Sequence, residues 1–482
     1  MNARMISRRR LLRMSGMALA GSLLAACQPR VVEKVVEKKE TVVVQASPQI
    51  VTVTEAPKEK IILRWMTPAE LGLERTMYTN FTYMFTEEYP HIKIEPSFES
   101  WSDYMTKLPA AVAAATPPDV IHTHRTLGQE YAYRGVLQDH NPWIERDNYD
   151  IDDFIPELLR LWQHGGKQYA LPKDSAVQGV YYNKDMFDAV GVPYPQPNWT
   201  WEDFKQTTLL LTRDANGRPA NDPKFDRTSI KQWGCAFLAL HIPADPTDAW
   251  IKSAVSDPTG SYYDQSQKKV YVDEPGMIQL FDMFADLRCV WNAMPTPAQA
   301  QLQGDPWRAG LVAMTFGHHA TTFFAKQERV RFNYDCTFTP AGPHGQYCGI
   351  SASAFGVTTK AAHPEEGWLW VKFFCSARVQ KIICEQKRWG VPRVSLIGCL
   401  EPVDGIPEHF SMVHLDAWKK DKPQLVKPWA TVATPIESKL KEIMINAYDA
   451  MMTCGKDAPR AAAAAAIAKP QLEAALAEVR EW

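Results

Sequence analysis

The sequence predicts an α/β protein in which short strands alternate with helices. Its 482 residues are enough for two domains with real cores. Residues 61–65 form an apolar run that a Thr-Pro pair ends, and residues 92–95 alternate apolar and charged side chains as a half-buried strand does. Residues 74–88 between them place four apolar side chains on one helical face: Met77, Phe81, Met84 and Phe85.

The same scheme repeats further along the chain, with a helix expected over residues 103–115 and an apolar strand within 117–124. Such alternation predicts a parallel sheet with helices on both faces, whose ligand crevice lies at the carboxyl ends of the strands. Four residues at these ends are candidate ligand contacts: Trp65, Thr67, Thr123 and His124. A core position is the alternative for Trp65, and a structural histidine is the alternative for at least one of His122 and His124.

Composition favours a carbohydrate ligand and argues against nucleic acid as a partner. The net charge of -2 leaves no basic excess. The chain has 16 Trp and 17 Tyr, and aromatic rings stack on the C–H faces of sugars while polar groups bond their hydroxyls. No metalloprotease motif, phosphate-binding loop or nucleophile elbow is present in the sequence, so we expect neither catalysis nor a cofactor. A secreted carbohydrate-active enzyme and a structural or adhesive lipoprotein are the alternatives.

The first sixty residues predict export and a membrane anchor. Consecutive Arg residues at 8–10 precede an apolar stretch of 13 residues at 14–26, which is shorter than the ~20 residues that a membrane-spanning helix needs. The Arg pair resembles a twin-arginine signal, with the general secretory route as the alternative. Leu-Ala-Ala-Cys at 24–27 resembles a bacterial lipobox, which implies a signal peptide over 1–26 and a lipid on Cys27 that holds the protein to a membrane outside the cytoplasm.

The segment after this cysteine, residues 27–60, predicts a disordered tether. From residue 30 on it alternates Val pairs with Glu and Lys, and it has neither aromatic residues nor Leu. Such a segment buries too little apolar area to order itself, although a short coiled coil is the alternative.

A resemblance to a known family rests on the order of motifs in the middle of the chain. Leu171-Pro172 precedes a strand that ends in Tyr-Tyr-Asn-Lys-Asp-Met-Phe at 181–187, followed by Gly-Val-Pro at 191–193. A helix start, Thr-Trp-Glu-Asp-Phe, comes next with Thr200 as its expected N-cap. Further matching segments follow the same order: 118–120, 310–314, 355–357 and 364–368. From about residue 60 to 482 the chain resembles the family 1 extracellular solute-binding proteins, relatives of maltose-binding protein.

The resemblance implies a two-lobed, periplasmic-binding-protein-like fold with a mainly parallel sheet in each lobe. The expected N-terminal lobe comprises 61–172 plus 351–390, and the expected C-terminal lobe comprises 173–350 plus 391–482. Hinge crossovers are expected near 171–175, near 349–353 and within 376–392.

The implied function is that of a monomer without a cofactor, which binds a sugar or oligosaccharide between its lobes and delivers it to the permease of an ABC importer with its ATPase. An anionic solute such as a glycerol-phosphate is the alternative ligand, and it would require clustered Arg or Lys.

Ten further candidate ligand contacts share a place at an expected crossover or strand end: Lys173, Asp174, Ser175, Gly317, His318, His319, Gly349, Ile350, Ser351 and Trp389. Charged groups in a crossover can reach a ligand from either lobe, and a glycine there lets backbone amides approach a hydroxyl closely. The adjacent histidines offer imidazoles to hydroxyls, whereas a zinc site would need two further ligands. Hinge residues without a ligand role are the alternative for the crossover positions.

Eight cysteines remain after Cys27, and none of them forms a Cys-x-x-Cys motif. Cys336 and Cys348 flank a turn at 340–345, so we expect a disulfide between them across a hairpin. Free buried thiols are expected for the rest, because clients of the twin-arginine route fold before export in a reducing cytosol.

Overall fold

The computed structural model describes most of the chain beyond its tether. The chain divides into two compact units, 1–57 and 58–482, and only the second contains described residues. These are 59–69, 72–236, 247–257, 260–264, 266, 268–296, 298–300, 305–318, 330–386, 390–400, 427–429 and 434–479. The expected signal peptide 1–26, the lipidation site Cys27 and the tether up to residue 58 lie outside them. None of the helices in these ranges is both long and apolar enough to cross a membrane.

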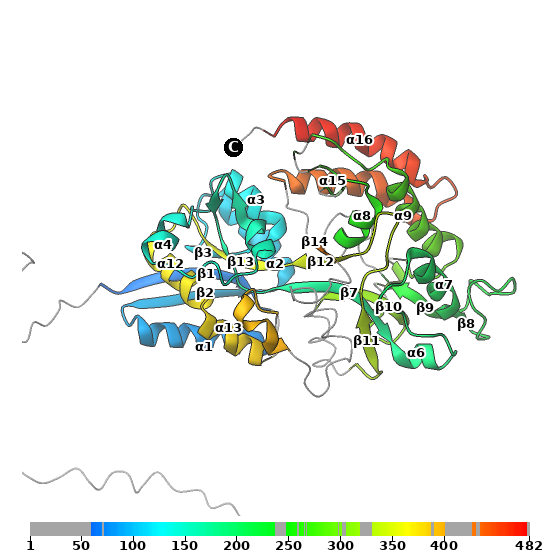
Figure 1. Ribbon diagram of the computed structural model, residues 1–482, viewed down its shortest axis with the longest axis horizontal. Coiled ribbons are helices and arrows are strands. Elements are labelled where there is room, and N and C mark those ends of the chain that lie inside the picture. The colour runs from blue at the N-terminus through cyan, green and yellow to red at the C-terminus, as the bar shows by residue number, and fades with distance from the viewer. Residues whose placement is uncertain are drawn as a thin grey trace, which may run out of the picture. The chain divides into compact units, whose positions relative to one another are not determined.

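A five-stranded sheet organises what we call the first lobe, in the order β2-β1-β3-β13-β6. The strands are β1 (Ile61–Pro68), β2 (Ile92–Glu99), β3 (Val120–His124), β6 (Leu171–Pro172) and β13 (Ser353–Val357). One face packs against α1 (Gly72–Glu88), α12 (Pro364–Phe374) and α13 (Ala377–Glu385), and the other packs against α2 (Trp101–Ala113) and α3 (Arg125–Tyr133) (Figure 1). The strands and helices expected over residues 61–124 are therefore confirmed.

A seven-stranded sheet organises the second lobe, in the order β14-β12-β7-β10-β9-β8, with β11 also paired to β7. The strands are β7 (Ala176–Asn183), β8 (Arg213–Asp214), β9 (Ile230–Ala236), β10 (Val312–His318), β11 (Tyr334–Thr337), β12 (Tyr347–Ser351) and β14 (Lys427–Trp429). The larger helices are α7 (Trp201–Leu211), α8 (Asp248–Ala254), α9 (Pro275–Ala285), α15 (Glu437–Tyr448) and α16 (Ala461–Ala477). Figure 1 shows α15 and α16 together over this lobe, and both contribute to its core.

Shorter elements complete the described chain. The helices are α4 (Asn141–Arg146), α5 (Pro156–Leu159), α6 (Lys184–Asp188), the 3-10 segments η1 (Arg160–Trp162), η3 (Val394–Leu400) and η4 (Asp449–Thr453), and the π-helical segment η2 (Asp286–Val290). A small antiparallel pair is formed by β4 (Gln163–His164) and β5 (Lys167–Gln168).

The α/β class and the two-lobed fold are confirmed, but both sheets are mixed rather than mainly parallel. β1 runs parallel to β2 and β3, whereas β13 runs antiparallel to β3 and β6, and β7 runs antiparallel to β10 and β12. The reason lies in how the chain moves between lobes. β6 leads from the first sheet into β7 of the second, and β12 leads back into β13, so the two passages run in opposite directions.

These two passages are short and are bonded to each other and to a third segment. The first covers residues 173–175 and the second is residue 352 alone. The Lys173 amide donates to the Ser353 carbonyl at 2.8 Å, and the Ser175 amide donates to the Gly390 carbonyl at 2.8 Å. Pro392 stays bonded to the first lobe, because its carbonyl accepts from Ile155 N at 2.8 Å. A core cluster that contains both Ile155 and strand β7 runs through this junction.

The prediction of a disulfide between Cys336 and Cys348 is wrong. Both thiols are free and buried, because β11 and β12 lie one after the other along β7 instead of facing each other: Thr337 is opposite Val180, and Ile350 is opposite Val177. The disulfides of the described chain join Cys289 to Cys454 and Cys384 to Cys399. The expectation of free thiols is therefore wrong for these four cysteines, whereas Cys235 and Cys375 are free and buried.

Local hydrogen bonds fix the surroundings of α7 and the loop that follows it. Thr200 caps α7 as expected: its hydroxyl accepts from the Asp203 amide at 3.2 Å, and the Asp203 carboxylate accepts from the Thr200 amide at 2.8 Å.

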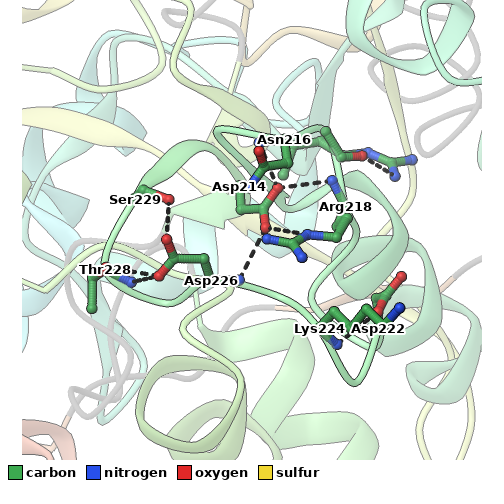
Figure 2. Close-up of polar contacts among 10 residues, drawn as sticks. Asp214, Asn216, Arg218, Asp222, Lys224, Asp226, Thr228 and Ser229 are labelled. Carbon is green, nitrogen blue, oxygen red and sulfur yellow. Dashed lines mark hydrogen bonds and ion pairs between the residues drawn. The ribbon is translucent and has the colours of Figure 1, made fainter.

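In the loop after β8, the buried Asp214 carboxylate accepts from the amides of Asn216 and Arg218 at 2.8 and 2.9 Å, and from the Arg218 guanidinium at 2.8 Å (Figure 2). These donors hold the loop in a tight turn.

Candidate functional site

The parallel strands β1, β2 and β3 end at one edge of the first sheet, and an exposed aromatic ring lies there. Trp101 opens α2 two residues after β2 ends, and 40% of its surface is exposed. Its ring centroid lies 5.6 Å from that of His124 and 6.1 Å from that of His122, edge-on in both cases. Because ligands of α/β proteins bind at the carboxyl ends of the strands, this edge is the candidate site in the first lobe.

Trp101 was not among the residues that the sequence singled out, although a signal for it exists. Ser100 caps α2 by accepting from the Asp103 amide at 3.0 Å. The Ser-x-x-Asp spacing predicts a helix that begins at residue 101, and so places a tryptophan in the first turn beside the strand ends.

Trp65 is fully buried in the core of the first lobe, and this matches the alternative weighed for it. Five rings contact its ring with centroids 5.0–6.0 Å away: Tyr78, Phe98, Phe355, Trp370 and Phe374. Thr67 is buried as well, and its hydroxyl donates to the Pro68 carbonyl at 3.3 Å. Neither side chain presents a surface to solvent in this arrangement.

The side chains at the end of β3 divide between core and edge. Thr123 is fully buried, and its hydroxyl donates to the His124 carbonyl at 3.4 Å. His124 is half-buried beside Trp101. His122 is buried against Tyr104, and neither of its ring nitrogens has a hydrogen-bond partner within the described part of the chain. Burial lowers the pKa of His122 well below its usual value, so the imidazole is neutral.

The first crossover carries a buried ion pair. Lys173 Nζ lies 2.7 Å from Asp174 Oδ2 and 3.3 Å from the Tyr78 hydroxyl, and Asp174 Oδ1 accepts from the Ser353 amide at 2.6 Å. Although burial opposes the charged form of Lys173, Asp174 raises the pKa of the ammonium above its ordinary value. Ser175 donates its hydroxyl to the Val391 carbonyl at 2.9 Å. These side chains therefore brace the crossovers against one another.

Candidates in the second lobe form one row across its sheet at the end nearest the crossovers. In β10, Gly317 is opposite Gly179 of β7, and His318 is opposite Gln178. In β12, Ile350 and Ser351 are buried and pair with the first two residues of β7.

Gly349 lies next to this row. A Cβ at Gly349 would lie 1.8 Å from the Gln178 side-chain oxygen, so a larger residue there would have to displace the end of that buried side chain. His319 and Trp389, like Cys27, lie outside the described residues.

The row and the first-lobe edge flank the same junction, where β6 enters β7 and β12 enters β13. They offer an exposed indole, a half-buried imidazole, backbone groups and a glycine. Among the described residues, no three His, Cys, Asp or Glu side chains are grouped so as to hold a metal ion. The arrangement is one of apolar surface and hydrogen-bonding groups at the junction of two lobes.

Comparison with solved structures supports the fold over most of the chain. A substrate-binding protein of Listeria monocytogenes in complex with cycloalternan, Lmo0181, superposes with a TM-score of 0.72 at 18% identity, covering 87% of this chain and 100% of that one. A solute-binding protein of Thermotoga lettingae bound with α-D-tagatose gives a TM-score of 0.69 at 16% identity, covering 86% and 100%.

Comparison of sequences gives the family. The melibiose/raffinose/stachyose-binding protein MelE of Bacillus subtilis is 26% identical over 176 residues, which is 36% of this chain and 39% of MelE. The match thus spans well under half the length of that relative. The profile of the bacterial extracellular solute-binding proteins matches residues 70–381. The chain therefore belongs to the bacterial extracellular solute-binding protein family.

Proposed function

We propose that this protein is the substrate-binding lipoprotein of an ABC importer, which binds a sugar or oligosaccharide between its lobes and delivers it to the permease. The observation that carries the proposal is the exposed ring of Trp101 beside His124, at the edge where the parallel strands end. Two proteins similar in fold were solved with cycloalternan and tagatose, and MelE is named for binding melibiose, raffinose and stachyose.

The chemistry of the edge suits a neutral polyhydroxylated ligand. An indole face covers the C–H surface of a pyranose ring, and a neutral or protonated imidazole bonds its hydroxyls. The second lobe would supply its part from Gly317 and His318 of the row, from Gly349 beside it, and from His319 and Trp389. A ligand that touches both sides binds the closed arrangement more tightly than the open one, so it closes the lobes.

The cations near the site argue against the anionic alternative. Lys173 is already bonded to Asp174 at 2.7 Å, and Arg125 lies 2.5 Å from Asp248. To bind either of these two buried cations, an anionic solute such as a glycerol-phosphate would have to displace the carboxylate from it. A sugar requires no such exchange.

The membrane anchor is part of the proposal. Cys27 would carry the lipid after removal of residues 1–26, and the monomeric body would work outside the cytoplasm on the tether 27–60. Mass spectrometry of the protein purified from membranes should give an N-terminal peptide that begins at a diacylglycerol-modified Cys27. An unmodified Cys27, or cleavage at another residue, would refute the anchor without touching the binding proposal.

A thermal-shift screen tests the binding function. Mono- and oligosaccharides, glycerol-3-phosphate and inorganic phosphate are each added to the protein, and a ligand that binds the folded state raises the melting temperature in proportion to ln(1 + [L]/Kd). We expect a rise with saccharides only. A rise with the phosphates alone would favour the anionic alternative, release of reducing sugar during incubation would favour an enzyme, and no shift with any compound would favour a structural lipoprotein.

A further inference from the structure

A buried ion pair joins the two lobes. Arg125 opens α3 directly after β3 of the first lobe, and Asp248 opens α8, which packs against β12 of the second lobe. Arg125 Nη2 lies 2.5 Å from Asp248 Oδ2, and the side chains are 3% and 2% exposed. Both charges are therefore shielded from water, and each faces a charge that the opposite lobe supplies.

Helix α3 makes a second contact between the lobes. Ser438 of α15 donates its hydroxyl to the Glu130 carboxylate of α3 at 2.9 Å. Figure 1 shows α3 beside the end of α15, and the two helices are in contact. The crossovers join the lobes covalently at β6–β7 and β12–β13, so α3 adds a non-covalent joint that opening of the lobes would break.

A cation beside Asp248 stabilises the buried acidic groups of the second lobe. Glu437, which is 4% exposed, accepts from the hydroxyls of Tyr262 and Tyr263 at 3.0 and 3.1 Å. Burial raises the pKa of both tyrosines, and Glu437 and then Asp248 raise the pKa further, so the two carboxylates share one neighbourhood. Two buried acids that act on the same pair of tyrosines are costly without positive charge, and Arg125 brings such a charge from the first lobe when the lobes are together.

We propose that Arg125 and Asp248 form a latch that favours the closed arrangement of the lobes before any ligand binds. They are positioning residues that set ligand affinity without touching the ligand. Removing one of the two charges leaves the other buried and unmatched in the closed arrangement, whereas water solvates it in the open one. The penalty falls on the closed state alone, and a smaller closed fraction weakens binding in proportion.

The distance between the lobes tests the latch without a ligand. Spin labels attached to Tyr83→Cys on α1 and Ile467→Cys on α16, which are 66% and 53% exposed, report this distance in the full-length protein by pulsed electron–electron double resonance. We expect a short distance with the latch intact. Arg125→Met or Asp248→Asn should add a longer distance and reduce the closed fraction relative to the open one on the order of 10-fold or more. The charge exchange, Arg125→Asp with Asp248→Arg, should restore the short distance.

A matched control breaks an ion pair to a buried carboxylate within one lobe. Arg218→Met removes the guanidinium that pairs with Asp214 (Figure 2). We expect this variant to lower the melting temperature but to keep the short distance between the spin labels. If both latch variants fold, by circular dichroism, and give the same distance distribution as the parent, the latch is refuted.

A second measurement rests on the proposed function. For a saccharide identified in the screen, Arg125→Met and Asp248→Asn should raise Kd about 10-fold, and the charge exchange should recover part of the loss. An unchanged Kd would contradict the latch. If no saccharide binds, the proposed function fails, and the ligand-free distances still decide the latch.

Discussion

Replacing Trp101 by Ala tests whether the ring at the carboxyl edge of the first sheet binds the sugar. The residue is 40% exposed. A tryptophan side chain has ~250 Å² of surface, so the ring offers a ligand about 100 Å². At ~25 cal/mol per Å², covering all of this surface contributes about 2.5 kcal/mol, and covering half of it contributes about 1.2 kcal/mol. We therefore expect Trp101→Ala to raise Kd by about 8- to 70-fold.

Isothermal titration calorimetry with a saccharide from the screen measures this change. Trp101→Phe, which keeps a smaller ring, should give an intermediate Kd. Tyr83→Ala serves as the control because Tyr83 is an aromatic residue on α1 with 66% of its surface exposed and lies outside the candidate site. A Kd for Trp101→Ala within twofold of the parent value would show that the indole contributes no stacking surface, and the site would have to be sought elsewhere.

Two further predictions concern stability. The double variant Cys289→Ser, Cys454→Ser removes a disulfide that spans 165 residues, and chain entropy predicts a loss of about 5 kcal/mol in the free energy of unfolding. For Cys384→Ser, Cys399→Ser, which removes a disulfide that spans 15 residues, the predicted loss is about 3 kcal/mol. Equal urea midpoints for the two variants would contradict this difference. Burial lowers the pKa of His140 to about 3, so the unfolded chain, with a pKa near 6.5, binds the extra proton. His140 then favours folding fully above pH 6.5 and loses about 2 kcal/mol of that contribution between pH 7.5 and 5. Between pH 7.5 and 5, the free energy of unfolding measured in urea should therefore fall by about 2 kcal/mol less for His140→Gln than for the parent. An equal fall in both proteins would show that His140 does not titrate this way.

Local patterns predicted the first lobe well because its determinants are local. A helical stripe and an alternating strand are each set by residues a few positions apart. In the second lobe, the capping box of Thr200 and Asp203 is local in the same way. The passages between lobes came from the family resemblance. Residues 173–175 and 352 carry no pattern that distinguishes a passage between two sheets from an ordinary turn.

The tryptophans show what local patterns leave undecided. Trp65 ends an apolar run beside the strand ends, where both a core and a ligand role fit. Its burial comes from rings far along the chain, such as Trp370 and Phe374, whose centroids lie 5.0 and 6.0 Å away. Trp101 is exposed because the helix begins with it at the edge of the sheet. Which tryptophan meets solvent is thus decided by tertiary packing and by a cap.

The Cys336–Cys348 disulfide was wrongly predicted for the same reason, because tertiary packing decides which strands pair. A turn between Cys336 and Cys348 favours a hairpin, but the strand that each segment pairs with is β7, which lies far earlier in the sequence. Because both segments use the same edge of β7 in succession, the thiols never face each other. Sequence spacing cannot reveal that each of the two segments pairs with a third strand and not with the other segment.

The two ion pairs near the junction differ in a way that bears on function. Lys173 and Asp174 are adjacent in the chain, and their further bond to Ser353 lies within the crossovers, so opening of the lobes need not break it. Arg125 and Asp248 come from opposite lobes, so their contact exists only while the lobes are together. The first pair thus holds the pivot, and the second biases the motion about it. Lys173 and Arg125 are thus both paired with the protein's own carboxylates, and under the proposed function we expect an uncharged ligand to bind through aromatic surface and hydrogen bonds.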